Sequence, residues 1–260
     1  MSRCGTVCAA MAYTDRQFGQ VLDALDRSGQ ADHTLVIATT DHGIAFPFMK
    51  CHLTDHGTGV FLVLRGPGGW EGGLVRDDMV SQIDLLPTIF QLIGEPVPEH
   101  VQGRALAANV EEPHRDAVFA SVNVHTVVQP MRSVRTDRWK YLRCWPINFP
   151  FTVLPNIDDS PTKALLYANG LRERVLPGRA LYDLLFDPNE THNLVEDGAY
   201  HGVRQSLEQR LHTWMTETKD PLLSGSLSLP EDVVLTSPDH YHPPGEDGSH
   251  PDGLEYLKID

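Results

Sequence analysis

Residues 34–43 read Thr-Leu-Val-Ile-Ala-Thr-Thr-Asp-His-Gly, an apolar run followed by two side chains that can bind a metal. An apolar, β-branched run bounded by polar residues is typical of a buried strand in a parallel sheet. Asp41 and His42 follow that strand, at the carboxyl end where α/β sheets bind ligands. A carboxylate and an imidazole side by side can both bind a divalent cation. The alternative is that Asp41 caps a turn and His42 is an ordinary surface residue.

The loop that leads to the next apolar run, residues 60–65, adds charged and titratable side chains. It carries Lys50, His52 and His56 between glycines that favour turns. A lysine beside a metal supplies positive charge for a sulfate or phosphate oxyanion. A solvated lysine and loop histidines without a catalytic task remain the alternatives.

The pattern on either side predicts two kinds of structure. Around the strands at 34–39 and 60–65, amphipathic helices are expected at 7–28 and 84–93, which indicates α/β architecture. Beyond residue 115, a small antiparallel sheet and a final helix are expected. Its strands are predicted at 117–122, 131–136, 139–143 and 180–185, with an irregular insertion at 145–178 and the helix at 201–218. We therefore predict domains at 1–114 and 115–222, followed by a loosely ordered tail at 223–260.

Composition excludes some classes of partner and selects none. The formal net charge of −14 disfavours nucleic acid and anionic membranes, because polyanions would be repelled. There is no run of about 18 apolar residues, so no membrane span is expected. Four cysteines in 260 residues do not make a disulfide framework. Nothing in these features points to a cellular compartment or an oligomeric state.

The order of these motifs resembles the sulfatase family of the alkaline phosphatase superfamily. The matching features are the Thr-Thr-Asp-His-Gly turn, Lys50, the glycines at 57 and 59, Leu-Arg-Gly-Pro-Gly at 64–68 and Ser-Gln-Ile-Asp-Leu-Leu-Pro at 81–87. The resemblance implies the C-terminal part of an alkaline-phosphatase-like mixed or parallel sheet with flanking helices. The small antiparallel C-terminal sheet would pack with a helix. It also implies that Asp41 and His42 ligate calcium and that Lys50 is a catalytic residue contacting the sulfate group.

The C-terminal half is most similar to the N-sulfoglucosamine sulfohydrolase (heparan N-sulfatase) branch. The segments are Gln-Pro-Met-Arg-Ser-Val-Arg-Thr-Asp at 129–137, Asp-Asp-Ser-Pro at 158–161, Leu-Tyr-Asp at 181–183, Phe-Asp-Pro-Asn-Glu at 186–190 and Glu-Thr-Lys-Asp-Pro at 217–221. This resemblance implies a hydrolase of sulfate esters or sulfamates acting on a sulfated small molecule or glycan, with N-sulfated glucosamine as the finer expectation. It places His125 and His52 on the substrate side of the site.

One part of the family's pattern has no match in this sequence. The family's nucleophile is a cysteine oxidised to formylglycine, in a Cys-x-(Pro/Ala)-(Ser/Gly)-Arg motif, and two further metal carboxylates form an Asp-Asp pair. No cysteine here fits that motif, and the Asp-Asp at 158–159 lies in the late insertion. The expectation is therefore a truncated, C-terminal portion that is inactive by itself. A phosphoesterase of the same superfamily and a non-catalytic fragment that binds an anionic sugar or a partner chain remain alternatives.

Overall fold

A computed structural model describes residues 3–70, 72–106, 115–145, 151–225, 227, 229 and 235–242. The chain forms two compact units that interleave along the sequence. The first comprises Met1–Thr39, Phe61–Asp77 and Gln82–Glu112, and the second comprises Thr40–Val60, Asp78–Ser81 and Pro113–Asp260. The predicted domain division at residues 114 and 222 stays a prediction.

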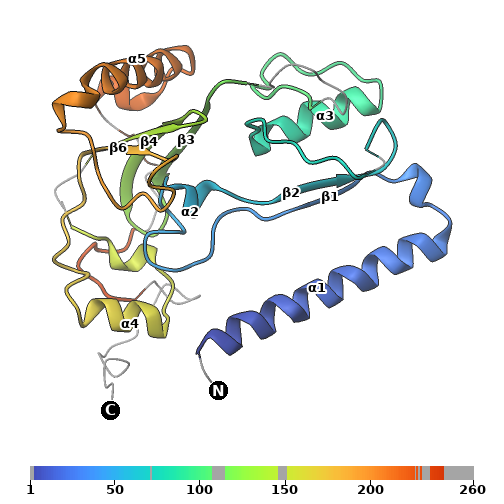
Figure 1. Cartoon of the computed structure of the whole chain (residues 1–260), viewed down its shortest axis with the longest axis horizontal. Coiled ribbons are helices and arrows are strands. Elements are labelled where there is room, and N and C mark those ends of the chain that lie inside the picture. The colour runs from blue at the N-terminus through green and yellow to red at the C-terminus, as the bar shows by residue number, and fades with distance from the viewer. Residues whose placement is uncertain are drawn as a thin grey trace. The chain divides into compact units, whose positions relative to one another are not determined.

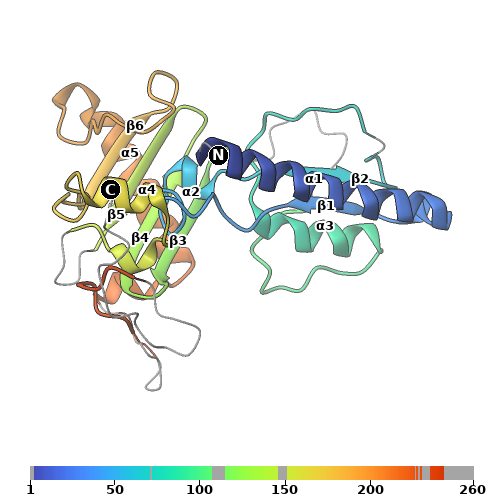
Figure 2. The same ribbon diagram turned by 90° about the horizontal axis from the view of Figure 1, so that it is seen from below.

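The first unit consists of helices around a two-stranded ribbon. Its elements are α1 (Arg3–Ser28), a 3-10 turn (Ala31–His33), β1 (Val36–Thr39), β2 (Leu62–Arg65), a second 3-10 turn (Gln82–Asp84) and α3 (Leu85–Leu92). Helix α1 ends before Gly29, whose φ of 69° is a conformation that glycine adopts without steric cost. Figure 1 shows α1 and α3 on opposite sides of the ribbon, and in Figure 2, turned by 90°, α1 crosses in front of it.

The pairing of β1 with β2 corrects one prediction. The two strands are antiparallel, with Val36 opposite Arg65 and Thr39 opposite Leu62, and all four residues of β1 are partly exposed. The prediction of a buried strand in a parallel sheet was therefore wrong in direction and in burial. A β-branched run favours extended backbone, but it does not specify the partner strand or its direction.

The second unit contains the predicted antiparallel sheet. Its strands β3 (Val118–Val124), β4 (Val128–Arg135), β5 (Trp139–Cys144) and β6 (Arg179–Asp183) lie in that order, and each pairs antiparallel with the next. Helix α5 (His201–Glu217) packs on the sheet, as Figure 1 shows. The core between them contains Val134, Tyr141, Leu181, Leu207, Leu211 and Met215, each 3% exposed or less. The predicted sheet and final helix are confirmed.

Shorter elements complete the second unit. They are α2 (Asp55–Thr58), α4 (Pro161–Tyr167) and 3-10 turns at Leu154–Asn156, Gly198–Tyr200 and Pro221–Ser224. Ser160 caps α4, because its Oγ accepts a hydrogen bond from the Lys163 N–H at 3.1 Å. In the predicted tail, the Tyr241 ring packs edge-on against Tyr167 at 4.9 Å, and His242 is buried. Among the described helices, none has the length and hydrophobicity needed to cross a membrane.

Candidate active site

The turn at residues 41–43 lies directly against α2. The Gly43 N–H donates to the Gly57 carbonyl oxygen at 2.9 Å. A β-carbon at Gly43 would overlap the carbonyl oxygen of His56, and one at Gly57 would overlap two carbonyl oxygens of the preceding loop. Both glycines are needed because only a hydrogen fits between the two backbone segments.

Asp41 and His42 place a carboxylate and a ring nitrogen side by side. His42 Nδ1 lies 2.7 Å from the Gly43 carbonyl oxygen, and Nε2 lies 3.3 Å from Asp41 Oδ2. Because a carbonyl oxygen only accepts, Nδ1 carries the proton, and in the neutral ring the Nε2 lone pair faces the carboxylate. Two acceptors in this position repel each other unless the ring takes a second proton or a cation binds both. A ligand histidine commonly donates its other N–H to a carbonyl oxygen in this way.

The pair is accessible to an ion, but it is not a complete calcium site. The Asp41 side chain is 81% exposed and that of His42 is 40% exposed. Residual desolvation raises the pKa of Asp41, but backbone hydrogen bonds, the charge of His42 and the Thr40 hydroxyl outweigh it and hold the pKa below its usual value. Calcium takes about six to eight oxygens. Within the described residues, no group of three or more His, Cys, Asp or Glu side chains is arranged to hold a metal. Asp41 and His42 therefore fit part of a donor set.

Lys50 lies in the same part of the unit, close to His125. Lys50 Nζ donates to Asp158 Oδ1 at 3.0 Å, and its side chain is 18% exposed. His125 occupies the turn between β3 and β4. Burial is the largest of the causes that lower its pKa. The nearby charges of Lys50 and His42 lower it further, and Asp158 opposes them. The structure thus brings together Lys50, His42 and His125, three of the predicted site residues.

His52 has a different environment. Its ring packs edge-on against Phe48, with 5.8 Å between the ring centres, and the Arg174 guanidinium lies 4.4 Å from the centre of the Phe48 ring. Burial, followed by the positive charge of Arg174, lowers the pKa of His52 to about 4. The imidazole is therefore neutral at physiological pH. The substrate contact predicted for His52 stays a prediction.

The loop contains two residues in the left-handed region, Phe48 with φ of 67° and Cys51 with φ of 64°. Such conformations are uncommon for residues with a β-carbon and are often found where a functional loop is held in place. Burial raises the pKa of the Cys51 thiol, which keeps it protonated and weakly nucleophilic. Cys51 thus has neither the motif nor the ionisation of a nucleophile.

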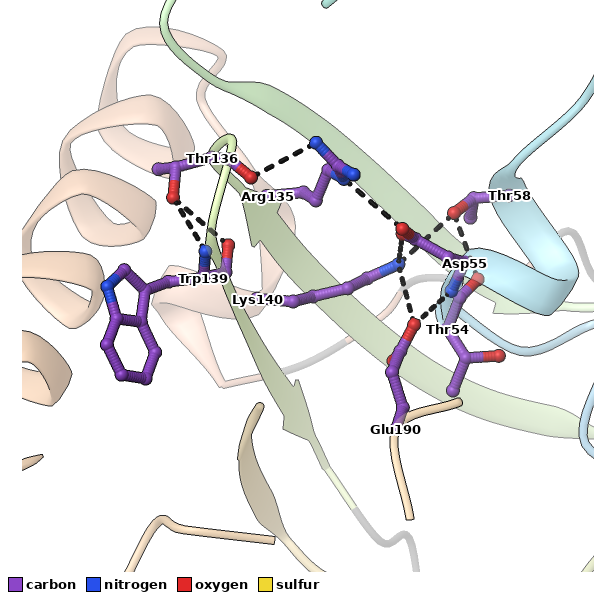
Figure 3. A network of polar contacts seen from close by, with 8 residues as sticks. All are labelled: Thr54, Asp55, Thr58, Arg135, Thr136, Trp139, Lys140 and Glu190. Atoms are coloured by element: carbon purple, nitrogen blue, oxygen red, sulfur yellow. Dashed lines mark hydrogen bonds and ion pairs between the residues drawn. The ribbon is translucent and has the colours of Figure 1, made fainter. Parts of the chain in front are cut away.

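A buried network of charges holds α2 in place (Figure 3). Lys140, on β5, is 1% exposed, and its Nζ lies 2.7 Å from Asp55 Oδ1 and 3.8 Å from Glu190 Oε1. Asp55 also accepts from Arg135 Nε at 3.3 Å, and its backbone N–H donates to the Glu190 carboxylate. Thr58, the last residue of α2, completes the contact to Lys140 at 3.3 Å.

This network couples the sheet to the site through backbone contacts. Burial raises the pKa of Glu190, and the Lys140 charge opposes that shift. Burial lowers the pKa of Lys140, while the charges of Glu190 and Asp55 oppose it. Since α2 supports Gly43 through Gly57, the same charges determine where the turn at 41–43 lies. Asp55 lies in the same loop as Lys50 and His56, but its partners Arg135 and Lys140 lie 80 and 85 residues away, and no local pattern indicates them.

Asp158 is a site residue to which the sequence assigned no role. It pairs with Lys50 across 108 residues of sequence, from the insertion after β5. The resemblance to the sulfamidase branch includes this Asp-Asp, but it assigns the pair no role in the site. Its neighbours Asn156 and Lys163 are buried polar residues, and burial cannot be derived from an isolated Asn or Lys in a sequence.

Comparison with known proteins identifies the family. The Sulfatase family model matches residues 2–95. N-sulphoglucosamine sulphohydrolase of Homo sapiens is 33% identical over 234 residues, which cover 80% of this chain and 46% of that protein. A solved 2-O GAG sulfatase is 25% identical with a TM-score of 0.62, covering 84% of this chain and 43% of the other. A phosphonate monoester hydrolase of Agrobacterium radiobacter is 25% identical with a TM-score of 0.59, covering 79% and 40%.

The chain spans less than half the length of each of these proteins. The predicted α/β fold of the alkaline phosphatase superfamily is confirmed by the structural likeness. The matched domain, the relatives and the fold agree, and the chain belongs to the sulfatase family.

Proposed function

We propose that this chain supplies part of the active site of a hydrolase of sulfate esters or sulfamates, with an N-sulfated glucosamine as substrate. The observation that carries the proposal is that Lys50 and His42 both lie close enough to His125 in the second unit to lower its pKa. A cation at that place stabilises the charge that develops on a sulfo group during its transfer. The likeness to N-sulphoglucosamine sulphohydrolase supports the choice of substrate.

In this proposal, Asp41 and His42 hold part of a calcium site. Calcium would polarise the sulfo group and neutralise its charge. Lys50 binds a sulfo oxygen, and α2 keeps the turn at 41–43 in position. His125, whose pKa is lowered, is neutral near physiological pH and accepts or donates a hydrogen bond on the substrate side. The nucleophile and the remaining metal ligands stay predictions from the family resemblance.

Calorimetric titration of calcium tests the metal half of the proposal. The purified chain is expected to bind calcium weakly, and Asp41→Asn is expected to weaken binding about tenfold or more, as loss of a ligand does. Asp137→Asn is the matched control, because Asp137 is an exposed aspartate outside the site. Equal affinity in the two variants, or no binding at millimolar calcium, would remove Asp41 from the site.

Titration with inorganic sulfate tests the anion half. Lys50→Gln is expected to weaken sulfate binding several-fold, while Arg172→Gln, which removes a cation paired with Asp239, should leave it unchanged. A phosphoesterase is the second candidate, favoured by the likeness to the phosphonate monoester hydrolase. Phosphate binding much tighter than sulfate at equal charge would favour that candidate.

A further inference from the structure

The segment 156–159 is anchored unusually firmly for part of a long insertion. Asn156 is 3% exposed, and its Oδ1 accepts three hydrogen bonds. The donors are the Thr126 N–H at 3.1 Å, the Thr126 hydroxyl at 2.8 Å and the Val127 N–H at 3.1 Å. Because Thr126 follows His125 directly, these bonds tie the insertion to the turn that carries the candidate substrate contact.

A completely buried lysine provides the second anchor. The Lys163 ammonium donates to the Ile157 carbonyl oxygen at 2.8 Å, to Asp159 Oδ1 at 2.9 Å and to the Tyr241 carbonyl oxygen at 2.6 Å. Asp159 is also bonded by His242, whose Nδ1 lies 2.6 Å from its Oδ2. Burying an ammonium is costly unless its N–H groups are all bonded, as they are here. The backbone on both sides of Asp158 is therefore fixed.

Between these anchors lies Asp158, whose side chain reaches solvent. Its side chain is 48% exposed, and one carboxylate oxygen lies 3.0 Å from Lys50 Nζ. Lys50 is the cation to which the proposed function assigns the sulfo group. An anion that approaches Lys50 must therefore displace this carboxylate or share the ammonium with it. The Asp158 side of the pair is open to solvent, and ion pairs open to solvent contribute only about 0–1 kcal/mol, so a good ligand can displace the carboxylate.

A displaced carboxylate changes which substrates fit. Beside a bound sulfo group it would repel a second anionic group, because like charges at such distances disfavour each other. It would attract an ammonium or a hydroxyl, which can donate the hydrogen bond that Lys50 previously gave. The geometry thus distinguishes ligands by the group carried near the sulfo group, a distinction that Lys50 alone cannot make.

We propose that Asp158 is a specificity residue of the Lys50 site. Its carboxylate pairs with Lys50 in the free protein, and it selects sulfated sugars that carry a cationic or hydroxyl donor beside the sulfo group. This inference rests on the proposed function, because it takes Lys50 as the contact for the anion. It adds a residue from the late insertion and a charge requirement on the substrate. The anchors at Asn156 and Lys163 are positioning residues for this carboxylate.

Titrations with three probes test the inference, and the NMR signals of His125 report the binding of each probe. The probes are inorganic sulfate, glucose 3-sulfate and glucosamine 3-sulfate. The two sugars differ at C2, next to the sulfo ester, where glucosamine carries an ammonium in place of a hydroxyl. Asp158→Asn is expected to bind inorganic sulfate about 3- to 10-fold more tightly, since about 1 kcal/mol of competition is removed. The natural sequence should prefer the amino sugar several-fold, and Asp158→Asn should lose that preference. Asp137→Asn, an exposed aspartate elsewhere, should change neither quantity.

Lys50→Gln separates the inference from the proposed function. If this substitution weakens sulfate binding while Asp158→Asn changes neither the affinity nor the preference, the role of Asp158 is wrong and Lys50 stays the anion contact. If Lys50→Gln has no effect, both statements fail. Absence of sulfate binding in the natural sequence and in both variants would also overturn both.

Discussion

Replacing Lys140 with methionine is expected to lower the free energy of unfolding by about 3 kcal/mol, because removing one partner of a buried ion pair costs about 3–5 kcal/mol. The ammonium that would be lost is 1% exposed and faces Glu190, whose side chain is 0% exposed. The lower end of the range applies for two reasons. Asp55 keeps Arg135 at 3.3 Å and is 30% exposed. The pKa of Glu190 is already raised by burial, so this carboxylate can take up a proton.

The same substitution should loosen the turn at 41–43, and this second effect distinguishes positioning from stability. Without Lys140, α2 loses its tie to β5, and the hydrogen bond from the Gly43 N–H to Gly57 should open more often. Unfolding in urea, followed by tryptophan fluorescence, measures the stability. Hydrogen exchange of the Gly43 amide measures the local opening.

Arg132→Met provides the matched control for this experiment. Arg132 is also a buried cation, with a side chain 2% exposed, but it pairs with Asp220, which caps the 3-10 turn after α5, and not with α2. It should destabilise the protein comparably while the Gly43 amide keeps its relative protection. A cost below about 1 kcal/mol for Lys140→Met would refute the buried-pair argument. Equal loosening of Gly43 by Arg132→Met would refute the coupling of the sheet to the turn. Adding Glu190→Gln to Lys140→Met should restore part of the stability, because it removes the unpaired charge.

Three further predictions concern pH, sterics and association. The pKa of His52 is about 4 in the folded chain and 6.5 in the unfolded chain. Neutral His52 therefore stabilises the fold above pH 6.5, and about 3 kcal/mol of the free energy of unfolding is lost as the pH falls toward 4. Urea unfolding at pH 7.5 and 4.5 should show this loss, and the same loss in His52→Gln would contradict the assignment. Gly43→Ala should weaken calcium and sulfate binding together, because the β-carbon would overlap the α2 backbone. The same substitution at Gly19, where a β-carbon meets nothing within 4 Å, should leave the stability of the protein unchanged or slightly raise it. Equal effects at both positions would contradict the steric argument. Phe18 and Val21 on α1 are 41% and 65% exposed, so the chain is expected to self-associate with rising concentration; light scattering that gives a monomer at all concentrations, unchanged by Val21→Gln, would contradict this.

The elements with a clear period or clear boundaries were predictable from the sequence. The C-terminal strands are short runs with apolar residues on both faces of the sheet, and the helix at 201–217 keeps its apolar stripe. Both were therefore predicted close to their observed bounds. The strand at 36–39 was predicted as a strand but not as an antiparallel, partly exposed one. Strand direction depends on pairing with residues 62–65, and a local pattern does not contain that information.

The candidate site divides in the same way. Asp41, His42 and Lys50 lie within ten residues, and a known motif connects them, so resemblance could indicate them. Asp158 could not be identified, because its importance comes from an ion pair with Lys50 that closes 108 residues of chain. The roles of Asn156 and Lys163 depend on burial, which is a property of the folded chain and not of the residue type.

The second unit explains why motifs distant in sequence occur together in this chain. The loop at 40–60 has few buried apolar residues of its own, Leu53 among them. Its position is determined by charges from elsewhere in the unit: Lys140 and Glu190 hold α2, and Asp158 faces Lys50. The segments at 129–143 and 181–194, which resemble the sulfamidase branch, therefore form the sheet and also hold the loop at 40–60 in position. It follows that substitutions such as Lys140→Met should change ligand affinity although the residue touches no ligand. Equally buried residues that pair outside the site, such as Arg132 with Asp220, should change stability alone.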